Sequence, residues 1–127
     1  MRLLRAGRAL VVRDADMGTH LWFVLTDPDP ERDWMVLVML VTVKPHTDRT
    51  LHLDVGDHRF IRHTSAVDFG TARYAPARKL EQALSSGRAT LEADMSPGLL
   101  ARVRAGLLTS ARTPNEIADD CRAKFQP

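Results

Sequence analysis

The chain has little cysteine and no long apolar run, the features that mark disulfide-bonded and membrane-spanning proteins. Its 127 residues include one cysteine, Cys121, so no disulfide can form within the chain, which favours a reducing compartment. The longest strongly apolar stretch, residues 34–43, is about half as long as the roughly 20 residues that a membrane-spanning helix needs. The N-terminal residues lack the apolar core of a signal peptide. We therefore expect a cytoplasmic protein that does not associate with membranes.

Lysine is also scarce, whereas arginine is abundant. The chain has 15 Arg and 3 Lys, and its net charge is only +2, so it is not a polycation. Arginine favours planar, bidentate contact with phosphate or carboxylate groups. A GC-rich genome also enriches arginine. The charge balance of a chain bears on its binding partners and not on its fold. The composition alone therefore leaves a nucleic-acid partner open.

The first half of the chain has the pattern of β-strands. Residues 20–26 are rich in Trp, Phe and Val and lead into a turn rich in Pro and Asp. Residues 34–43 predict a strand buried on both faces, because the apolar run does not alternate. Residues 51–55 alternate as a half-buried strand does, and a further strand is predicted to start near residue 59.

The second half has the pattern of helices. Pro76 can occupy a first helical turn, and Ser96-Pro97 predicts an N-cap followed by proline at the first helical position. The stretch from Thr113 to Glu116 matches a capping box. We expect helices near residues 97–109 and 114–124.

Strands followed by helices predict an α+β fold, with an antiparallel sheet or small barrel packed by C-terminal helices. The length fits a single domain over residues 1–127. The barrel is predicted at about 18–70 and the helical part at about 76–125.

This order of elements resembles the PemK/MazF family of toxin endoribonucleases over residues 18–110. Residues 18–42, GTHLWFVLTDPDPERDWMVLVMLVT, resemble the family's opening: a glycine, a first strand, a charged loop and an apolar strand. Residues 63–108 resemble its closing part, in which a Ser-x-Val strand precedes a final helix. The resemblance implies an SH3-like barrel, endoribonuclease activity, neutralisation by an antitoxin, and a homodimer. Arg32 and Thr42 stand where the family has a cation and a hydroxyl group, although the family's Arg-Pro is absent.

Residues 51–69 concentrate groups that transfer protons, including three of the five histidines. Cleavage of RNA by its own 2′-hydroxyl needs a base, an acid and a cation near the phosphate. His58 and His63 are the predicted acid–base pair, because histidine titrates near neutral pH. His20 is predicted to join them if the fold brings it close. In a strand over residues 60–63, Arg62 and His63 would point to opposite faces.

The predicted function is a metal-independent endoribonuclease toxin of a toxin–antitoxin pair, which cuts single-stranded RNA by acid–base catalysis and uses no cofactor. The predicted catalytic residues are His58, His63, Arg32, His20 and Thr42, and the predicted substrate-binding residues are Asp57, Arg59, Arg62, Ser65 and Trp34. The expected partners are single-stranded RNA, an antitoxin and a second copy of the chain. The alternative function is a non-enzymatic SH3-like barrel module that binds protein or nucleic acid.

Two other interpretations of the histidine-rich segment remain open. The spacing His52-x-Asp54-x-x-Asp57-His58 offers ligands that suit Zn or Mn. A solvated turn with structural hydrogen bonds would also contain such residues, because Asp favours turns. Aromatic residues in strands more often pack in the core than stack on bases, so Trp34 also has a purely structural interpretation.

Overall fold

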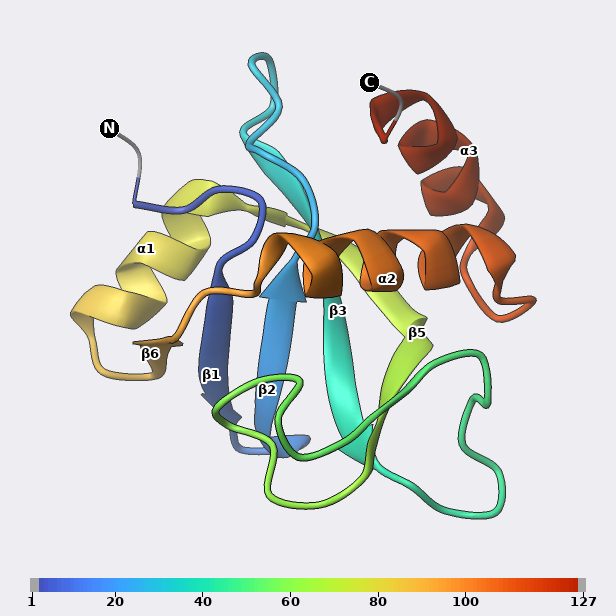
Figure 1. Cartoon of the computed structure of the whole chain (residues 1–127). Coiled ribbons are helices and arrows are strands. Elements are labelled where there is room, and N and C mark those ends of the chain that lie inside the picture. Colours follow the sequence, from blue (N-terminus) through green and yellow to red (C-terminus); the bar gives the residue numbers. More distant parts are fainter. Residues whose placement is uncertain (1–2, 126–127) are drawn as a thin grey trace.

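One curled antiparallel sheet organises the chain (Figure 1). The computed structural model describes residues 3–125, and its six strands are ordered β4-β5-β3-β2-β1-β6. The strands are β1 (Ala9–Asp14), β2 (Gly18–Val24), β3 (Trp34–Thr42), β4 (His52–Leu53), β5 (Ser65–Pro76) and β6 (Ala89–Glu92). The helices are α1 (Ala77–Ser85), α2 (Pro97–Thr109) and α3 (Asn115–Lys124). The predicted α+β class with an antiparallel sheet is confirmed.

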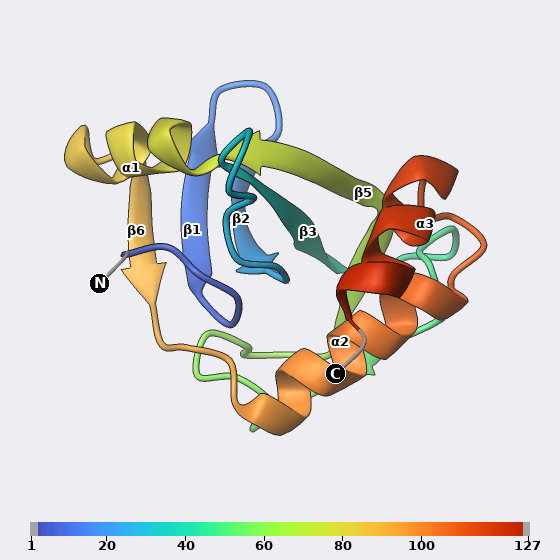
Figure 2. The same ribbon diagram turned by 90° about the horizontal axis from the view of Figure 1, so that it is seen from above.

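The sheet is covered on both faces, and each face has its own apolar cluster. On the concave face, side chains such as Phe23 and Phe69 pack with Val103 and Leu107 of α2 and with Ile117 of α3. On the other face, α1 packs over a separate cluster of sheet residues. Figure 2 shows α2 lying across the concave side of the curled strands and α1 outside them. The sheet is therefore a half-barrel that α2 closes.

The apolar stretch predicted to be a doubly buried strand is β3. Its residues from Met35 to Leu40 are all buried, because alternate side chains enter the two clusters. β3 pairs with β2 on one side and β5 on the other, and a register shift falls between Leu37 and Met39. The prediction for residues 34–43 is confirmed.

The sheet extends beyond the predicted limits of residues 18–70. β1 and β6 were not predicted, and they pair with each other antiparallel. β6 has only four residues, too few for a clear alternating pattern. The strand expected from residue 59 begins instead at Ser65, so residues 59–64 belong to a loop. That correction determines where the arginines and histidines of this segment lie.

The two predicted C-terminal helices are confirmed, but only one of them has the predicted cap. The Ser96 side chain accepts a hydrogen bond from the Leu99 N–H at the start of α2. The predicted capping box of α3 does not form. The Thr113 hydroxyl donates to the Leu107 carbonyl (2.7 Å), and no side chain caps α3. A tertiary hydrogen bond thus replaces the local one.

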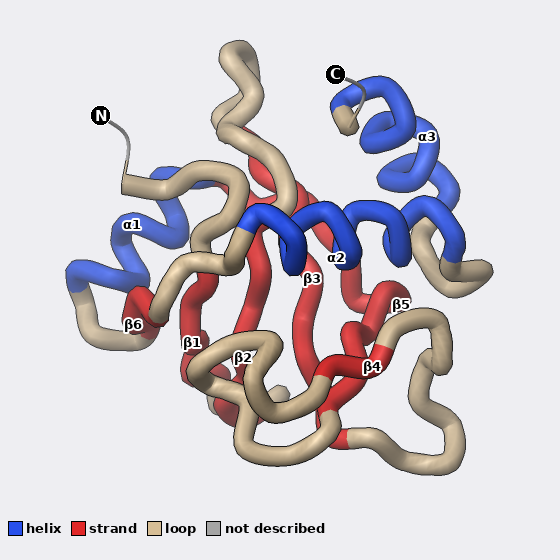
Figure 3. The backbone as a smooth tube through the Cα atoms, viewed as in Figure 1, coloured by secondary structure: helices blue, strands red, loops and turns tan. Residues whose placement is uncertain are grey.

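Two long loops flank the short strand β4 at one end of the sheet (Figure 3). Residues 43–51 connect β3 to β4, and residues 54–64 connect β4 to β5. Within residues 3–125, no helix has both the length and the apolar character needed to cross a membrane.

Candidate functional site

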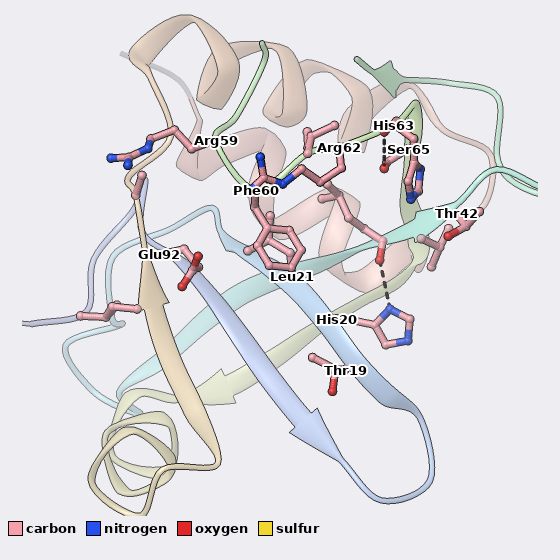
Figure 4. A pocket seen from close by; sticks show the side chains of 15 residues that line it. Thr19, His20, Leu21, Thr42, Arg59, Phe60, Arg62, His63, Ser65 and Glu92 are labelled. Carbon is pink, nitrogen blue, oxygen red and sulfur yellow. Dashed lines mark hydrogen bonds between the residues drawn. The ribbon is translucent and has the colours of Figure 1, made fainter. Parts of the chain in front are cut away.

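A cleft of about 1060 Å³ opens between the loop of residues 54–64 and the sheet. Figure 4 shows its lining side chains. The sheet contributes residues from β2, β3, β5 and β6, and the loop contributes the run from Arg59 to His63. The polar lining residues are Thr19, His20, Thr42, Arg59, Arg62, His63, Ser65 and Glu92.

The fold gathers six of the ten predicted site residues at this cleft. They are His20, Thr42, Arg59, Arg62, His63 and Ser65. His20 comes from β2, Thr42 from β3 and Ser65 from β5, which are neighbours in the sheet, and the other three come from the loop. His20 and His63 both line this cleft, whereas His58 does not, so the three histidines are not all gathered there. The other four, Arg32, Trp34, Asp57 and His58, do not line the cleft.

Arg32 and Trp34 lie at the opposite end of β3 from Thr42. Eight residue steps of an extended strand place Trp34 and Thr42 roughly 26 Å apart. The Arg32 guanidinium lies 4.9 Å from the centre of the Trp34 ring, and that ring packs on Tyr74 with centroids 5.2 Å apart. These residues form a separate surface cluster and cannot share a substrate phosphate with the cleft histidines.

His58 is buried and holds the loop in place. Its Nδ1 accepts a hydrogen bond from the Phe60 N–H (3.1 Å), and its Nε2 contacts the Ala93 carbonyl. With the proton on Nε2, the ring donates to Ala93 and accepts from Phe60, so both nitrogens are occupied. The ring also makes an edge contact with Phe23 of the core, with centroids 5.8 Å apart. The geometry gives His58 a positioning role, not the freely oriented turn position expected from the sequence.

Asp57 anchors the same loop to α2. Its carboxylate accepts the Asp54 N–H (2.8 Å) and pairs with Arg102 (2.9 Å). The backbone hydrogen bond, with the Arg102 contact second, lowers the pKa of Asp57. Asp54 in turn accepts the Thr64 hydroxyl (2.6 Å) across the base of the loop. The two ends of the loop are therefore tied together.

The tip of the loop presents its polar side chains to the cleft. Ile61 is buried in the concave-face cluster, which fixes the tip against the sheet. Phe60, next to it, leaves 40% of its surface exposed. Because residues 59–64 are not a strand, Arg62 and His63 are not forced to opposite faces, and both line the cleft.

The two cleft histidines differ in how their ring nitrogens are engaged. The Nδ1 of His63 lies 3.2 Å from the Thr64 carbonyl. Among residues 3–125, its Nε2 makes no hydrogen bond, so the tautomer with Nδ1–H leaves a lone pair on Nε2 available. His20 has carbonyls at both nitrogens: Met17 at 2.8 Å from Nε2 and Leu40 at 3.3 Å from Nδ1. A neutral imidazole has one N–H, so it can donate to only one of these carbonyls.

Three charged side chains at the cleft have no partner within the part of the chain described. Arg59, Arg62 and Glu92 make no side-chain hydrogen bond and no ion pair there. Elsewhere, arginines such as Arg102 and Arg104 are engaged by carboxylates or carbonyls. A ligand with both acceptor and donor groups would satisfy the charges of the cleft.

Phe60, Glu92 and Thr19 are cleft residues that the sequence analysis did not select. Phe60 lies inside the histidine-rich segment, and its position between two arginines was an available signal. Glu92 had no such signal, because β6 was not predicted.

The alternative of a metal site is not supported. Residues 3–125 contain no group of three His, Cys, Asp or Glu side chains arranged to hold a metal ion. Of the four candidate ligands, Asp57 pairs with Arg102 and His58 is buried against Ala93.

Cys121 is buried in the concave-face cluster, and burial raises its thiol pKa to about 11, which disfavours the reactive thiolate.

Comparison with known proteins gives no relative from which a function can be transferred. The chain matches no protein-family model, no curated protein and no solved structure.

Proposed function

We propose that the cleft binds single-stranded RNA and cleaves it by acid–base catalysis without a metal ion. The observation that carries the proposal is the gathering of His20, His63, Arg59, Arg62 and an exposed Phe60 on one cleft. Arginines bind phosphates, histidines transfer protons near neutral pH, and an exposed aromatic ring can stack on a base.

His63 is the proposed general base. Its available Nε2 lone pair can accept the proton of the attacking 2′-hydroxyl, while Nδ1–H remains on the Thr64 carbonyl and fixes the ring. His20 is the proposed acid for the leaving oxygen. It must release one of its two carbonyl contacts to reach the substrate.

Arg62 is the proposed cation for the charge that gathers on the phosphate, in place of the distant Arg32. It is exposed and has no partner among residues 3–125, so a phosphate would not need to displace one. Thr42 and Ser65 face each other in the pairing of β3 with β5 and are the proposed hydroxyl donors to the phosphate. Ser65 donates its single O–H to the His63 carbonyl (3.0 Å), so it must release that hydrogen bond to reach the phosphate.

The test is product formation from mixed-sequence single-stranded RNA by the purified protein, in the presence of EDTA. The His63→Ala variant should cleave about 10²- to 10⁴-fold more slowly, the usual effect of removing a proton-transfer group. The matched control is His46→Ala, because His46 is exposed in the other loop and uses only its carbonyl, which accepts from Arg112. Equal cleavage by the parent and His63→Ala would remove the catalytic role. So would a parent protein that cleaves no RNA.

A non-enzymatic module is the second candidate. The carbonyls that face both His20 nitrogens favour it, because a neutral ring donates to one of them and the other carbonyl covers the second nitrogen. A protein of this kind would bind RNA at the cleft and leave it intact. Binding without product formation would therefore support this candidate over the first.

We also propose that the half-barrel is a divergent SH3-like barrel of PemK/MazF type, in a cytoplasmic toxin paired with an antitoxin and active as a homodimer. The curled antiparallel sheet and the closing helix α2 are compatible with that architecture. A monomer mass by light scattering at micromolar concentration would contradict the dimer. The absence of a small antitoxin reading frame beside the gene would count against the toxin role.

A further inference from the structure

We propose that the end of the cleft formed by Phe60 and Glu92 is a base-binding subsite that selects guanine. The inference rests on the proposed function, that the cleft binds single-stranded RNA, and it adds the identity of the base. Figure 4 shows the Glu92 side chain toward one end of the cleft, the Phe60 ring on that side of the cleft's middle, and His20, His63, Ser65 and Thr42 toward the other end.

Phe60 has the properties of a rigid stacking platform. The residue is 40% exposed, although an aromatic side chain of this size is usually packed. Its backbone N–H is held by His58, and the next residue, Ile61, is buried in the concave-face cluster. The ring can therefore offer a face to a base at little cost in conformational freedom. Arg59 and Arg62 on either side supply cations for the adjoining phosphates.

Glu92 supplies hydrogen-bond acceptors at the same end. It is half-buried at the end of β6, and its backbone position is fixed by pairing with Ala9 of β1. The carboxylate makes no hydrogen bond or ion pair to any residue from 3 to 125, even though Arg59 lines the same cleft. The next residue, Ala93, is held by His58, so Phe60 and Glu92 are connected through one buried ring.

An ionised carboxylate only accepts hydrogen bonds, and this property discriminates among bases. The Watson–Crick edge of guanine presents two neighbouring donors, N1–H and the 2-amino group, which match the two carboxylate oxygens. Adenine and cytosine present one amino donor beside an acceptor nitrogen. Uracil presents one N–H between two carbonyls, which a carboxylate repels. Guanine is therefore the base that a stacked Phe60 and an adjacent Glu92 fit best.

The experiment measures the affinity of the purified protein for pentamers in which one guanine, inosine, adenine or uracil lies within uridines. The residues carry 2′-fluoro groups so that cleavage cannot interfere. We expect the guanine pentamer to bind at least about tenfold more tightly than the adenine and uracil ones, the usual scale of a bidentate base contact. Inosine, which lacks the 2-amino group, should bind with intermediate affinity.

Two variants separate the carboxylate from the ring. Glu92→Gln should remove the preference for guanine, because it changes the group that recognises the guanine edge. The affinity for the uridine pentamer should stay within about twofold of the parent's. Phe60→Ala should weaken all the pentamers by about tenfold, whereas Phe60→Trp should retain binding. Glu31→Gln, an exposed change in the loop between β2 and β3, is the control and should have no effect.

The outcomes distinguish this inference from the proposed function. Binding of all the pentamers with equal affinity would overturn the guanine subsite and leave the RNA cleft intact. A guanine preference that survives Glu92→Gln would overturn the assignment to Glu92. If no pentamer binds at millimolar concentration, both the subsite and the proposed function fail.

Discussion

The two loops on either side of β4 are both rich in polar residues, but only the loop of residues 54–64 contributes side chains to the cleft. In the loop of residues 43–51, Asp48 is buried and accepts hydrogen bonds from Thr50 and Ser110, and Arg112 donates to the His46 carbonyl. In the loop of residues 54–64, the tip residues Arg59 and Arg62 have no partner within residues 3–125. The first loop is bound to the segment that connects α2 to α3, whereas the tip of the second faces a cleft.

The difference shows that the density of polar residues does not by itself mark a functional site. The second loop contains both kinds of side chain: His58 and Asp57 are satisfied at its base, and the charges at its tip are not. Satisfied polar groups stabilise a loop, while unsatisfied ones at a cleft are available to a ligand. The contrast can be tested by changing one polar residue at a time.

The largest effect on stability is expected from Asp48→Ala in the loop of residues 43–51. Burial raises the pKa of Asp48, but the hydrogen bonds from Ser110 and Thr50 outweigh it, so the net pKa is lowered. Removing the carboxylate leaves these hydrogen-bond donors without an acceptor. We therefore expect the free energy of unfolding to fall by about 3 kcal/mol. Urea denaturation at pH 7 measures it. Arg49→Ala, an exposed neighbour, is the control and should change stability by less than about 0.5 kcal/mol. Equal losses in the two variants would refute the structural role of Asp48.

His58→Ala should lower the free energy of unfolding by about 2 kcal/mol, because the change leaves buried polar groups unsatisfied and opens a space beside Phe23. Denaturant unfolding again gives the value. The exposed His52 of β4 provides the control, and His52→Ala should be nearly neutral. A neutral His58→Ala variant would contradict the role of His58 in holding the loop.

The double variant Arg59→Ala/Arg62→Ala should bind single-stranded RNA about tenfold more weakly. The slope of log affinity against log salt concentration should become smaller in magnitude by about 1.4, because each of the two phosphate contacts on a single strand contributes about 0.7. Fluorescence anisotropy over a series of salt concentrations measures both quantities. The control pair, Arg49→Ala/Arg78→Ala, removes the same charge from exposed positions outside the cleft. If both pairs weaken binding equally, the cleft is not the RNA site.

The smallest effect is expected from Asp57→Asn. The backbone N–H of Asp54 and then Arg102 lower the pKa of Asp57, so its contribution to stability is present above about pH 4 and is lost as the pH falls further. Because the pair with Arg102 is partly exposed, we expect a loss below about 1 kcal/mol at pH 7. Unfolding at pH 7 and pH 3 checks both points. The difference between the parent and the variant should be smaller at pH 3 than at pH 7, and a constant difference would contradict the titration of Asp57.

The sequence by itself determined the elements whose signals are local. The apolar run of β3, the Ser96-Pro97 start of α2 and the order of strands before helices were sufficient for the α+β class. The density of histidines and arginines also indicated the segment that contains the loop of residues 54–64, whose tip lines the cleft. Patterns of this kind are readable because burial on a strand or helix imposes a period on the residues.

Only the tertiary structure decided which polar residues meet. β1 and β6 lacked strong patterns, so the approach of Glu92 to the cleft depended on sheet pairing. His58 and His63 looked equivalent in the sequence, yet the carbonyl of Ala93, 35 residues away, holds one of them in the interior, whereas the other lines the cleft. Arg32 was assigned to the site by its position in the chain, and the length of β3 carries it to the opposite end. Hydrogen bonds between distant segments leave no periodic trace in a sequence, so the partners of these side chains had to come from the fold.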